Sequence, residues 1–269
     1  MQTLLVLLLV TTTVSAIKSP DEQIAEEYLS HYGYLHRESN NGVRLLRRGE
    51  KDQAFRDSLK MFQSVAGLKV TGKVDKATKE KMLEKRCGLP DYAGAGVANV
   101  ITKWNKTMPT YSILNYVDGL TPQQVQNVFQ QAFDKWSAVI PLNFSYVAYD
   151  YDAYMRFAYI DGKDKTYAFS TVGYNPGKYK NGILFDSGDS WCDKDPEKIK
   201  NDSTDLLSIA THEIGHLLGL DHVFDPKAIM APYYRPPLDW SGKYKEPQLG
   251  PNDIQRIRAI YGSPIFINR

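Results

Sequence analysis

The spacing of apolar residues in the second half of the chain predicts alternating strands and helices. Apolar side chains at helical spacing between residues 121 and 139 predict a helix there, and further helices are expected at about 203–218 and 251–261. Short apolar runs predict strands near residues 109–116, 143–148, 153–159, 165–170 and 182–186. This order predicts an α+β/α/β fold, in which three helices pack on a twisted, mostly parallel five-stranded sheet.

The first third of the chain shows helical spacing without strand patterns. Helices are predicted at roughly 20–35, 51–66 and 75–85, and the side chain of Asp75 suits an N-cap of the last. The stretch at 92–100 is small and uncharged, as is typical of a linker open to proteases. We therefore predict a helical domain at 17–91, a linker at 92–100 and a larger domain at 101–269.

The first residues are typical of a secretory signal peptide. Residues 1–16 contain an apolar run from Leu4 to Val10 and end in Val14-Ser15-Ala16. No later segment approaches about 18 consecutive apolar residues, and residues 263–269 are too few for a lipid-anchor signal. We expect a secreted, monomeric protein of the extracellular space or matrix with no membrane anchor. The net charge of +2 argues against a nucleic-acid partner.

The run from His212 to His222 carries the strongest chemical signal. On a helix, His212 and His216 lie on one face, so both imidazoles can reach one metal ion. Glu213 lies about 100° around the helix, where it can hold and deprotonate a metal-bound water. Gly219 suits the helix end, because positive φ lets the chain turn back and present His222 as a third ligand. Three protein ligands leave a fourth position open, as in catalytic zinc sites.

An ordinary helix whose histidines face solvent or core is the alternative interpretation. That interpretation is much the weaker one, because the chain has only five histidines and the motif specifies five residue types at fixed spacings. Such a match would rarely arise by chance. The sequence therefore predicts a catalytic zinc site.

Two further motifs resemble those of a known family. With the run from Ala228 through Met230 to Tyr234, the chain resembles the metzincin metalloproteases, in which a turn places a methionine under the imidazoles. The segment Lys85-Arg86-Cys87-Gly88-Leu89-Pro90-Asp91 resembles the cysteine switch of the matrix metalloproteinases, or matrixins. The resemblance is to a minimal, matrilysin-like form. No hemopexin-like domain is expected, because only seven residues follow residue 262.

The resemblance implies a latent zymogen. In the latent form the Cys87 thiolate would occupy the fourth zinc position, while Arg86 and Asp91 would pair and shape the loop. Lys85 is a departure, because the family more often has proline there. A disulfide between Cys87 and Cys192 is the alternative for two cysteines in a secreted chain.

The predicted metal content differs from the family pattern. Matrixins generally hold a second, structural zinc, but the histidines after residue 36 are all used in the predicted catalytic site, and Tyr167 and Leu184 stand where histidines are expected. We therefore predict one zinc ion per chain. Asp186 and Asp189 match two ligands of the family's calcium site, and their interpretation as solvent-facing acids stays open beside it.

The implied activity is zinc-dependent hydrolysis of peptide bonds. Glu213 would take a proton from water and return it to the leaving amine. The substrate would lie extended beside Ala168 as an extra strand. The pocket for the side chain after the cut bond would be deep enough for large apolar residues because Ser208 is small, with walls formed by Pro232, Tyr233 and Tyr234.

The expected partners follow from this interpretation. They are protein substrates of the extracellular matrix or other secreted proteins, an activating protease and, by resemblance, tissue inhibitors of metalloproteinases. The polar segment at 37–50 is either solvated surface or, as in matrixins, a loop that an activating protease cuts first. Two alternatives stay open. Another metzincin, astacin-like or reprolysin-like, is disfavoured by the motif from Arg86 to Asp91, and a secreted zinc-binding module without catalysis is disfavoured by Glu213.

Overall fold

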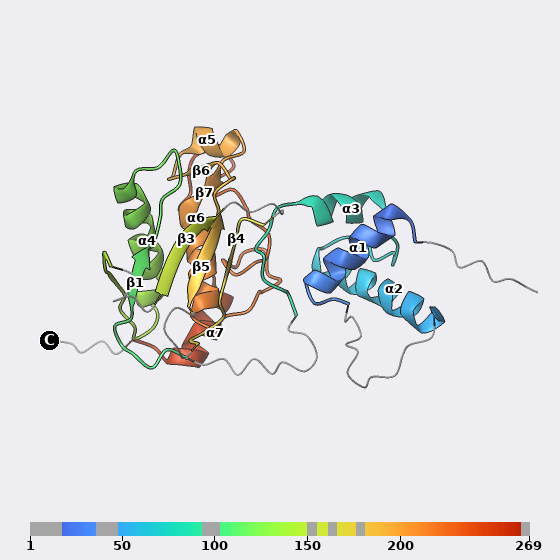
Figure 1. Ribbon diagram of the computed structural model, residues 1–269, viewed down its shortest axis with the longest axis horizontal. Coiled ribbons are helices and arrows are strands. Elements are labelled where there is room, and N and C mark those ends of the chain that lie inside the picture. Colours follow the sequence, from blue (N-terminus) through green and yellow to red (C-terminus); the bar gives the residue numbers. More distant parts are fainter. Residues whose placement is uncertain are drawn as a thin grey trace, which may run out of the picture.

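The computed structural model describes residues 18–35, 48–92, 103–149, 155–160, 166–175 and 181–264. Three helices, α1 to α3, form a separate lobe beside a larger unit of sheet and helices (Figure 1). The predicted signal peptide, the linker beyond Tyr92 and most of the segment at 37–50 lie outside the described residues. Within the described ranges, no helix is long and apolar enough to cross a membrane.

The helices of the N-terminal lobe are α1 (Pro20–His31), α2 (Arg48–Val65) and α3 (Lys76–Leu83). Ser19 and Glu22 form a capping box that begins α1. Asp75 caps α3 by accepting a hydrogen bond from the Thr78 N–H, as predicted. The lobe has its own apolar core, formed by Ala25, Leu29, Tyr32, Tyr34, Phe55, Leu59, Phe62 and Met82.

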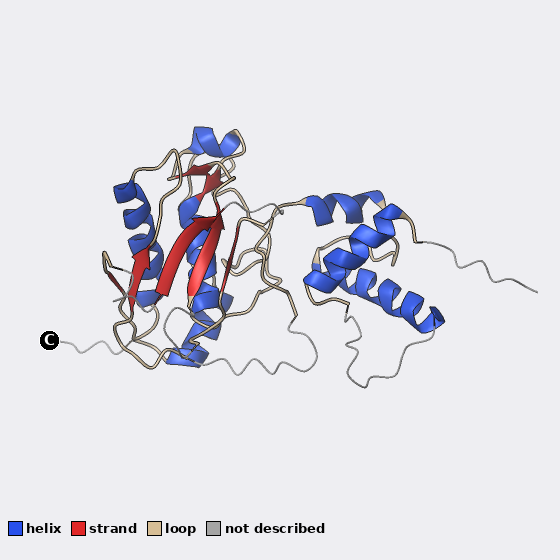
Figure 2. Cartoon of the chain, viewed as in Figure 1, coloured by secondary structure: helices blue, strands red, loops and turns tan. Residues whose placement is uncertain are grey.

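Five strands form one sheet in the order β2-β1-β3-β5-β4. Figure 2 shows the strands in red beside the helices in blue. They are β1 (Thr110–Ile113), β2 (Ser145–Tyr146), β3 (Met155–Ile160), β4 (Ala168–Ser170) and β5 (Gly182–Asp186). Neighbouring strands are parallel except for β4, which pairs with β5 in antiparallel orientation at the edge. The predicted sheet is confirmed, and each strand overlaps its predicted range.

Helices α4 (Pro122–Ser137) and α6 (Leu206–Leu217) pack against each other, and both contribute to the core beneath the sheet. The apolar face predicted for α4 is the buried one, and Phe129 stacks on Phe157 of β3 with ring centroids 4.6 Å apart. Every residue of α6 is buried. The last helix, α7 (Pro251–Tyr261), has the predicted bounds.

Three short elements were not predicted. Strand β6 (Trp191–Cys192) pairs in parallel with β7 (Thr204–Asp205), and α5 (Pro196–Lys200) lies between them in the chain. Elements of two and five residues are too short to leave a periodic pattern in the sequence. Because β7 leads directly into α6, the zinc-site helix begins at Leu206, later than the predicted residue 203.

Candidate metal centre

Helix α6 carries the first two imidazoles of the predicted zinc site. Asp205 begins the helix by accepting a hydrogen bond of 3.0 Å from the Ser208 N–H. His212 and His216 follow one turn apart and are buried. After the helix, Gly219 has a φ of +103°, which a residue without Cβ adopts at little cost. The chain turns back there and brings His222 to the other two rings.

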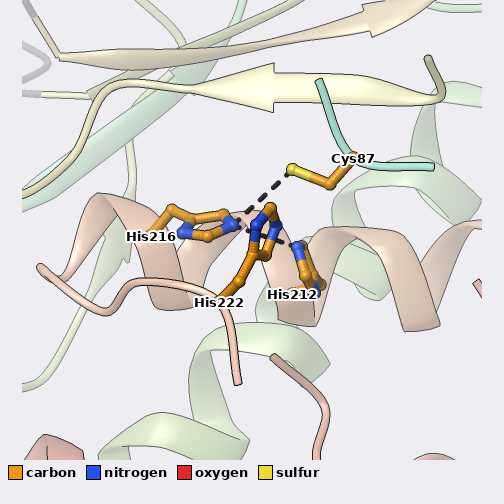
Figure 3. Close-up of side chains that lie close together, drawn as sticks. All are labelled: Cys87, His212, His216 and His222. Carbon is orange, nitrogen blue, oxygen red and sulfur yellow. Dashed lines mark hydrogen bonds between the residues drawn. The ribbon is translucent and has the colours of Figure 1, made fainter. Parts of the chain in front are cut away.

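The three imidazoles and the thiol of Cys87 converge on one point (Figure 3). One ligand atom from each of the four residues lies within 4.8 Å of the others. Nε2 of His216 is 3.0 Å from Nε2 of His212 and 3.6 Å from Sγ of Cys87. In the part of the chain that the structure describes, this is the one group of its kind.

The orientation of the rings fits a zinc ion. Nδ1 of His212 lies 2.7 Å from the carbonyl oxygen of Ile229, and Nδ1 of His216 lies 2.6 Å from that of Leu220. An acceptor at Nδ1 keeps the proton on that nitrogen and leaves Nε2 free for a metal. Nε2 of His222 is buried, and no described residue gives it a hydrogen bond, as expected for a nitrogen that binds an ion.

Burial gives the ligand groups protonation states that suit a cation. It lowers the pKa of His212 to about 3, with the neighbouring His222 adding to the effect, and it also lowers the pKa values of His216 and His222. The imidazoles are therefore neutral, which is the form that binds metals. Burial raises the pKa of the Cys87 thiol, so a proton or a cation must accompany the sulfur there.

Glu213 lies on α6 beside the ligand rings and is only 1% exposed. Neither of its carboxylate oxygens has a well-aligned hydrogen bond to a described residue. Burial raises the pKa of Glu213 to about 8, while the nearby Cys87 and Ser170 side chains act in the opposite direction. A buried acid without well-aligned hydrogen bonds lowers stability, and such groups are typical of functional sites.

Met230 lies against the zinc-site helix, as the resemblance implied. It is fully buried, and a Cβ placed on Gly215 would be 2.3 Å from its sulfur, so Met230 packs against α6 at the glycine that lies between the two histidines in the sequence. Asp253, on α7, holds this turn by accepting hydrogen bonds from the Ile229 and Met230 N–H groups at 2.8 and 3.2 Å. The sequence did not indicate this role of Asp253, because an acidic residue in the first turn of a helix is common and predicts only a favourable interaction with the helix dipole.

Arg86 and Asp91 form the ion pair that the resemblance implied. Nη1 of Arg86 donates to Oδ2 of Asp91 at 2.9 Å, Nη2 contacts Oδ1, and neither side chain is exposed. Burial alone would raise the pKa of Asp91, but its contacts with His222 and Arg86 lower that pKa to about 2, so the carboxylate is charged.

Aromatic residues of the helical lobe complete this pair. The Tyr34 hydroxyl donates to Oδ2 of Asp91 at 2.5 Å, and the Arg86 guanidinium lies 3.9 Å from the centroid of the Tyr32 ring. The Tyr28 hydroxyl accepts from Nη1 of Arg86 at 3.2 Å. The sequence did not point to these tyrosines, because aromatic residues near helices are ordinarily core residues.

The segment Arg86–Gly88 lies across the edge of the sheet. The Gly88 N–H donates to the carbonyl oxygen of Ala168 at 2.9 Å, and the Cys87 N–H donates to that of Pro232 at 3.0 Å. The segment thus occupies the side of β4 where the substrate backbone is predicted to lie, and it presents the thiol to the three imidazoles.

A cavity of about 530 Å³ lies next to the ligand cluster. Residues predicted for the substrate pocket line it, namely Ser208, Pro232, Tyr233 and Tyr234, while Ala168 lies on the β4 edge. The residues at 235–238 and 245–248 also line the cavity. Their place at the cavity could not be predicted from the sequence, because a loop without a periodic pattern gives no sign of where it folds back.

The two acids predicted as calcium ligands have partners within the chain. Oδ1 of Asp186 accepts a hydrogen bond of 2.8 Å from the Gly188 N–H, and Oδ1 of Asp189 contacts the amino group of Lys85. Calcium binding therefore stays a prediction. Lys85, which departs from the family pattern, ties the segment before Arg86 to the end of β5.

The alternative of a disulfide between the two cysteines is wrong. Cys87 and Cys192 are both free and buried, and Cys87 belongs to the ligand cluster. Cys192 lies on β6, where burial and the neighbouring Asp205 raise the pKa of its thiol to about 11.

Comparison with known proteins covers most of the chain. Residues 103–262 match the matrixin model of the M10 peptidases, and residues 18–82 match a model described as a peptidoglycan-binding domain. The chain is 37% identical to matrix metalloproteinase-C of Caenorhabditis elegans, 34% to matrix metalloproteinase-16 of Rattus norvegicus and 32% to macrophage metalloelastase of the same species.

These three alignments cover 91%, 89% and 97% of the chain. They cover only 44%, 41% and 56% of the relatives, so the chain spans about half of their length. The exact domain boundaries at 91 and 101 stay predictions. The family inferred from the two motifs is confirmed, and the chain belongs to the matrixins.

Proposed function

We propose that the chain is a zinc-dependent endopeptidase in a latent form. The observation that carries this proposal is the convergence of three buried, neutral imidazoles with the Cys87 thiol, beside a buried acid that makes no well-aligned hydrogen bond to a described residue. His212, His216 and His222 would hold the ion. When bound there, zinc supplies a Lewis acid that polarises the scissile carbonyl and lowers the pKa of water.

Glu213 moves the proton in the proposed reaction. Its free carboxylate oxygens lie beside the ligand rings, where they can hold a water molecule and accept its proton. The same carboxyl group then protonates the leaving amine. A carboxyl group at this position suits the double role, because it can take the proton of the water and return it to the leaving amine without moving to another site.

The segment Arg86–Gly88 keeps the enzyme latent in two ways. The Cys87 sulfur, which lies among the three imidazoles, would take the fourth ligand position on a bound zinc ion, and the backbone of the segment bonds to Ala168 and Pro232. A substrate pairing with β4 needs the same Ala168 carbonyl group. Activation therefore requires the segment to leave, and cleavage by another protease within 92–101 is the proposed route.

The cavity supports a preference for large apolar side chains after the cut bond. Ser208 has a small side chain, and the rings of Tyr233 and Tyr234 give the cavity apolar walls. Cleavage of a peptide library by activated protein tests this preference. Substituting Leu for Ser208 should shift cleavage toward shorter residues, and a library profile without preference for Leu, Ile or Met would contradict the proposal.

The setting of this activity is also a proposal. Residues 1–16 support secretion into the extracellular space, and the matrixin family supports proteins of the extracellular matrix or other secreted proteins as substrates. Tissue inhibitors of metalloproteinases are proposed partners on the same family grounds.

The experiment uses three forms of the full chain. Cys87→Ser removes the sulfur ligand but keeps the backbone contacts of the segment, so the segment should leave the site for part of the time. The unprocessed variant should then hydrolyse a fluorogenic peptide slowly, while the wild-type precursor should not. Adding Glu213→Gln to Cys87→Ser should lower the rate by about 10²–10⁴-fold and leave one zinc ion per chain. Removal of zinc with a chelator should abolish the activity of Cys87→Ser. Equal rates with and without Glu213 would favour a zinc-binding module that lacks catalysis.

A further inference from the structure

The three imidazoles differ in the source of the group that faces Nδ1. For His212 and His216 this group is a backbone carbonyl, of Ile229 and Leu220. Both carbonyls belong to the same structural unit as the histidines and stay with them when the N-terminal lobe leaves. For His222 the group is the carboxylate of Asp91, which belongs to the segment that must leave on activation.

The contact between His222 and Asp91 is short and shielded from solvent. Nδ1 of His222 lies 2.8 Å from Oδ1 of Asp91, and neither side chain is exposed to solvent. The two atoms are within hydrogen-bonding distance but less well aligned than the contacts with the two carbonyl groups, and the charge in this contact is on the Asp91 carboxylate, because His222 is neutral. No other described residue gives this nitrogen a hydrogen bond.

Asp91 has other partners, and these account for the shape of the loop. Oδ2 accepts from Nη1 of Arg86 and from the Tyr34 hydroxyl, while Oδ1 faces both Nη2 of Arg86 and Nδ1 of His222. The contacts with Arg86 and Tyr34 lie within the N-terminal segment. The contact with His222 is the one that reaches a metal ligand.

An acceptor at the far nitrogen of a ligand imidazole acts on the metal. It keeps the proton on Nδ1, fixes the ring orientation and makes Nε2 a stronger donor. A carboxylate strengthens the Nε2 donor more than a carbonyl group does, because its negative charge also attracts the cation.

We propose that Asp91 is a positioning residue for the zinc ion, which acts through His222 and makes the precursor bind zinc more tightly than the processed enzyme. The N-terminal segment then contributes twice to the metal, directly through the Cys87 sulfur and indirectly through the Asp91 carboxylate. This inference rests on the zinc site of the proposed function.

The test measures zinc affinity and does not depend on activity. The parent protein is the full chain with Cys87→Ser and Glu213→Gln, so that neither the sulfur ligand nor self-cleavage contributes. Zinc affinity is measured by competition with a chromogenic chelator. Asp91→Ala in this parent should weaken zinc binding by about 10–100-fold, the usual effect of removing such a partner.

Two further variants separate this role from simple support of the loop. Asp91→Asn keeps an oxygen acceptor for His222 and should restore most of the affinity. Tyr34→Phe removes a hydrogen bond to the other carboxylate oxygen without touching His222, and its zinc affinity should stay within about threefold of the parent, well below the effect of losing a partner of the metal ligand.

Each outcome bears on the inference. Equal zinc affinity of Asp91→Ala and the parent would overturn it. A loss in Tyr34→Phe as large as that in Asp91→Ala would overturn it as well, because the effect would then come from docking of the lobe. A parent that binds no zinc would overturn the proposed function itself, and the inference with it.

Discussion

Substitution of Gly215 by alanine tests how tightly the zinc-site helix is packed. Gly215 lies between His212 and His216 on α6. A Cβ at this position would lie 2.3 Å from the sulfur of Met230 and 2.8 Å from Cζ2 of Trp136. Both distances are well below the optimal separation of about 3.5–4.0 Å between carbon atoms. Met230 or the helix must therefore move.

The structure allows the size of the effect to be worked out. Trp136 cannot easily yield, because it is fully buried and its Nε1–H donates to the Thr211 carbonyl oxygen at 3.0 Å. An extra methyl group in such a core costs about 1–3 kcal/mol, and we expect the upper half of that range. The higher helix propensity of alanine returns about 1 kcal/mol. Gly215→Ala should therefore lower the free energy of unfolding by roughly 1–2 kcal/mol.

The assay is denaturant unfolding of the full chain, in a Glu213→Gln background that prevents self-cleavage. Gly49→Ala is the matched control, because it makes the same change in α2 at a position where a Cβ would meet no described atom within 4 Å. The control should be as stable as the parent or slightly more stable. If Gly215→Ala behaved like Gly49→Ala, packing against Met230 and Trp136 would not be what disfavours a larger residue at position 215.

Other predictions concern latency and the second thiol. Arg86→Ala leaves Asp91 buried without its guanidinium partner, a change that costs about 3–5 kcal/mol in buried pairs, so the unprocessed protein should cleave a fluorogenic peptide; a rate equal to that of the wild-type precursor would contradict this. Lys85→Ala removes the partner of Asp189, whose side chain is 5% exposed, while Lys85 itself is 39% exposed. Lys85→Ala should therefore speed alkylation of Cys87, though less than Arg86→Ala does. An unchanged alkylation rate would mean that the Lys85–Asp189 pair does not hold the segment that carries Cys87. Because burial and Asp205 raise the pKa of Cys192 to about 11, little of its thiol is ionised at pH 8 and its alkylation should increase only as the pH nears that value. Peptide mapping by mass spectrometry checks this, and rapid modification of Cys192 at pH 8 in the folded protein would disprove it.

Local periodicity explains why much of the fold and of the site could be predicted. The four-residue spacing of His212 and His216 fixes their relation on any helix, and a glycine after that helix permits the turn toward His222. The apolar face of α4 follows from the same periodicity, and a carboxylate at Asp75 suits the start of a helix wherever it lies. Each of these features depends on residues within one or two turns.

The residues that were missed act across long stretches of chain. Asp253 holds the turn at Met230 from α7, and Tyr34 contacts Asp91 from the turn that follows α1. Lys85 meets Asp189 only because the N-terminal segment lies against the end of β5. No spacing in the sequence relates such pairs, because their separation along the chain has no fixed relation to their distance in space.

The sequence by itself determined the helix that carries the imidazoles, the acid beside them, the strands of the sheet and the thiol as a candidate fourth ligand, since these follow from short-range geometry and from matrixin motifs. Only the tertiary structure decided that Cys87 is free of Cys192 and lies at the imidazoles, and that Asp91 faces both Arg86 and His222. The physical reason is that backbone dihedral angles and side-chain periodicity encode local elements. Which distant groups share one buried site depends on how those elements pack.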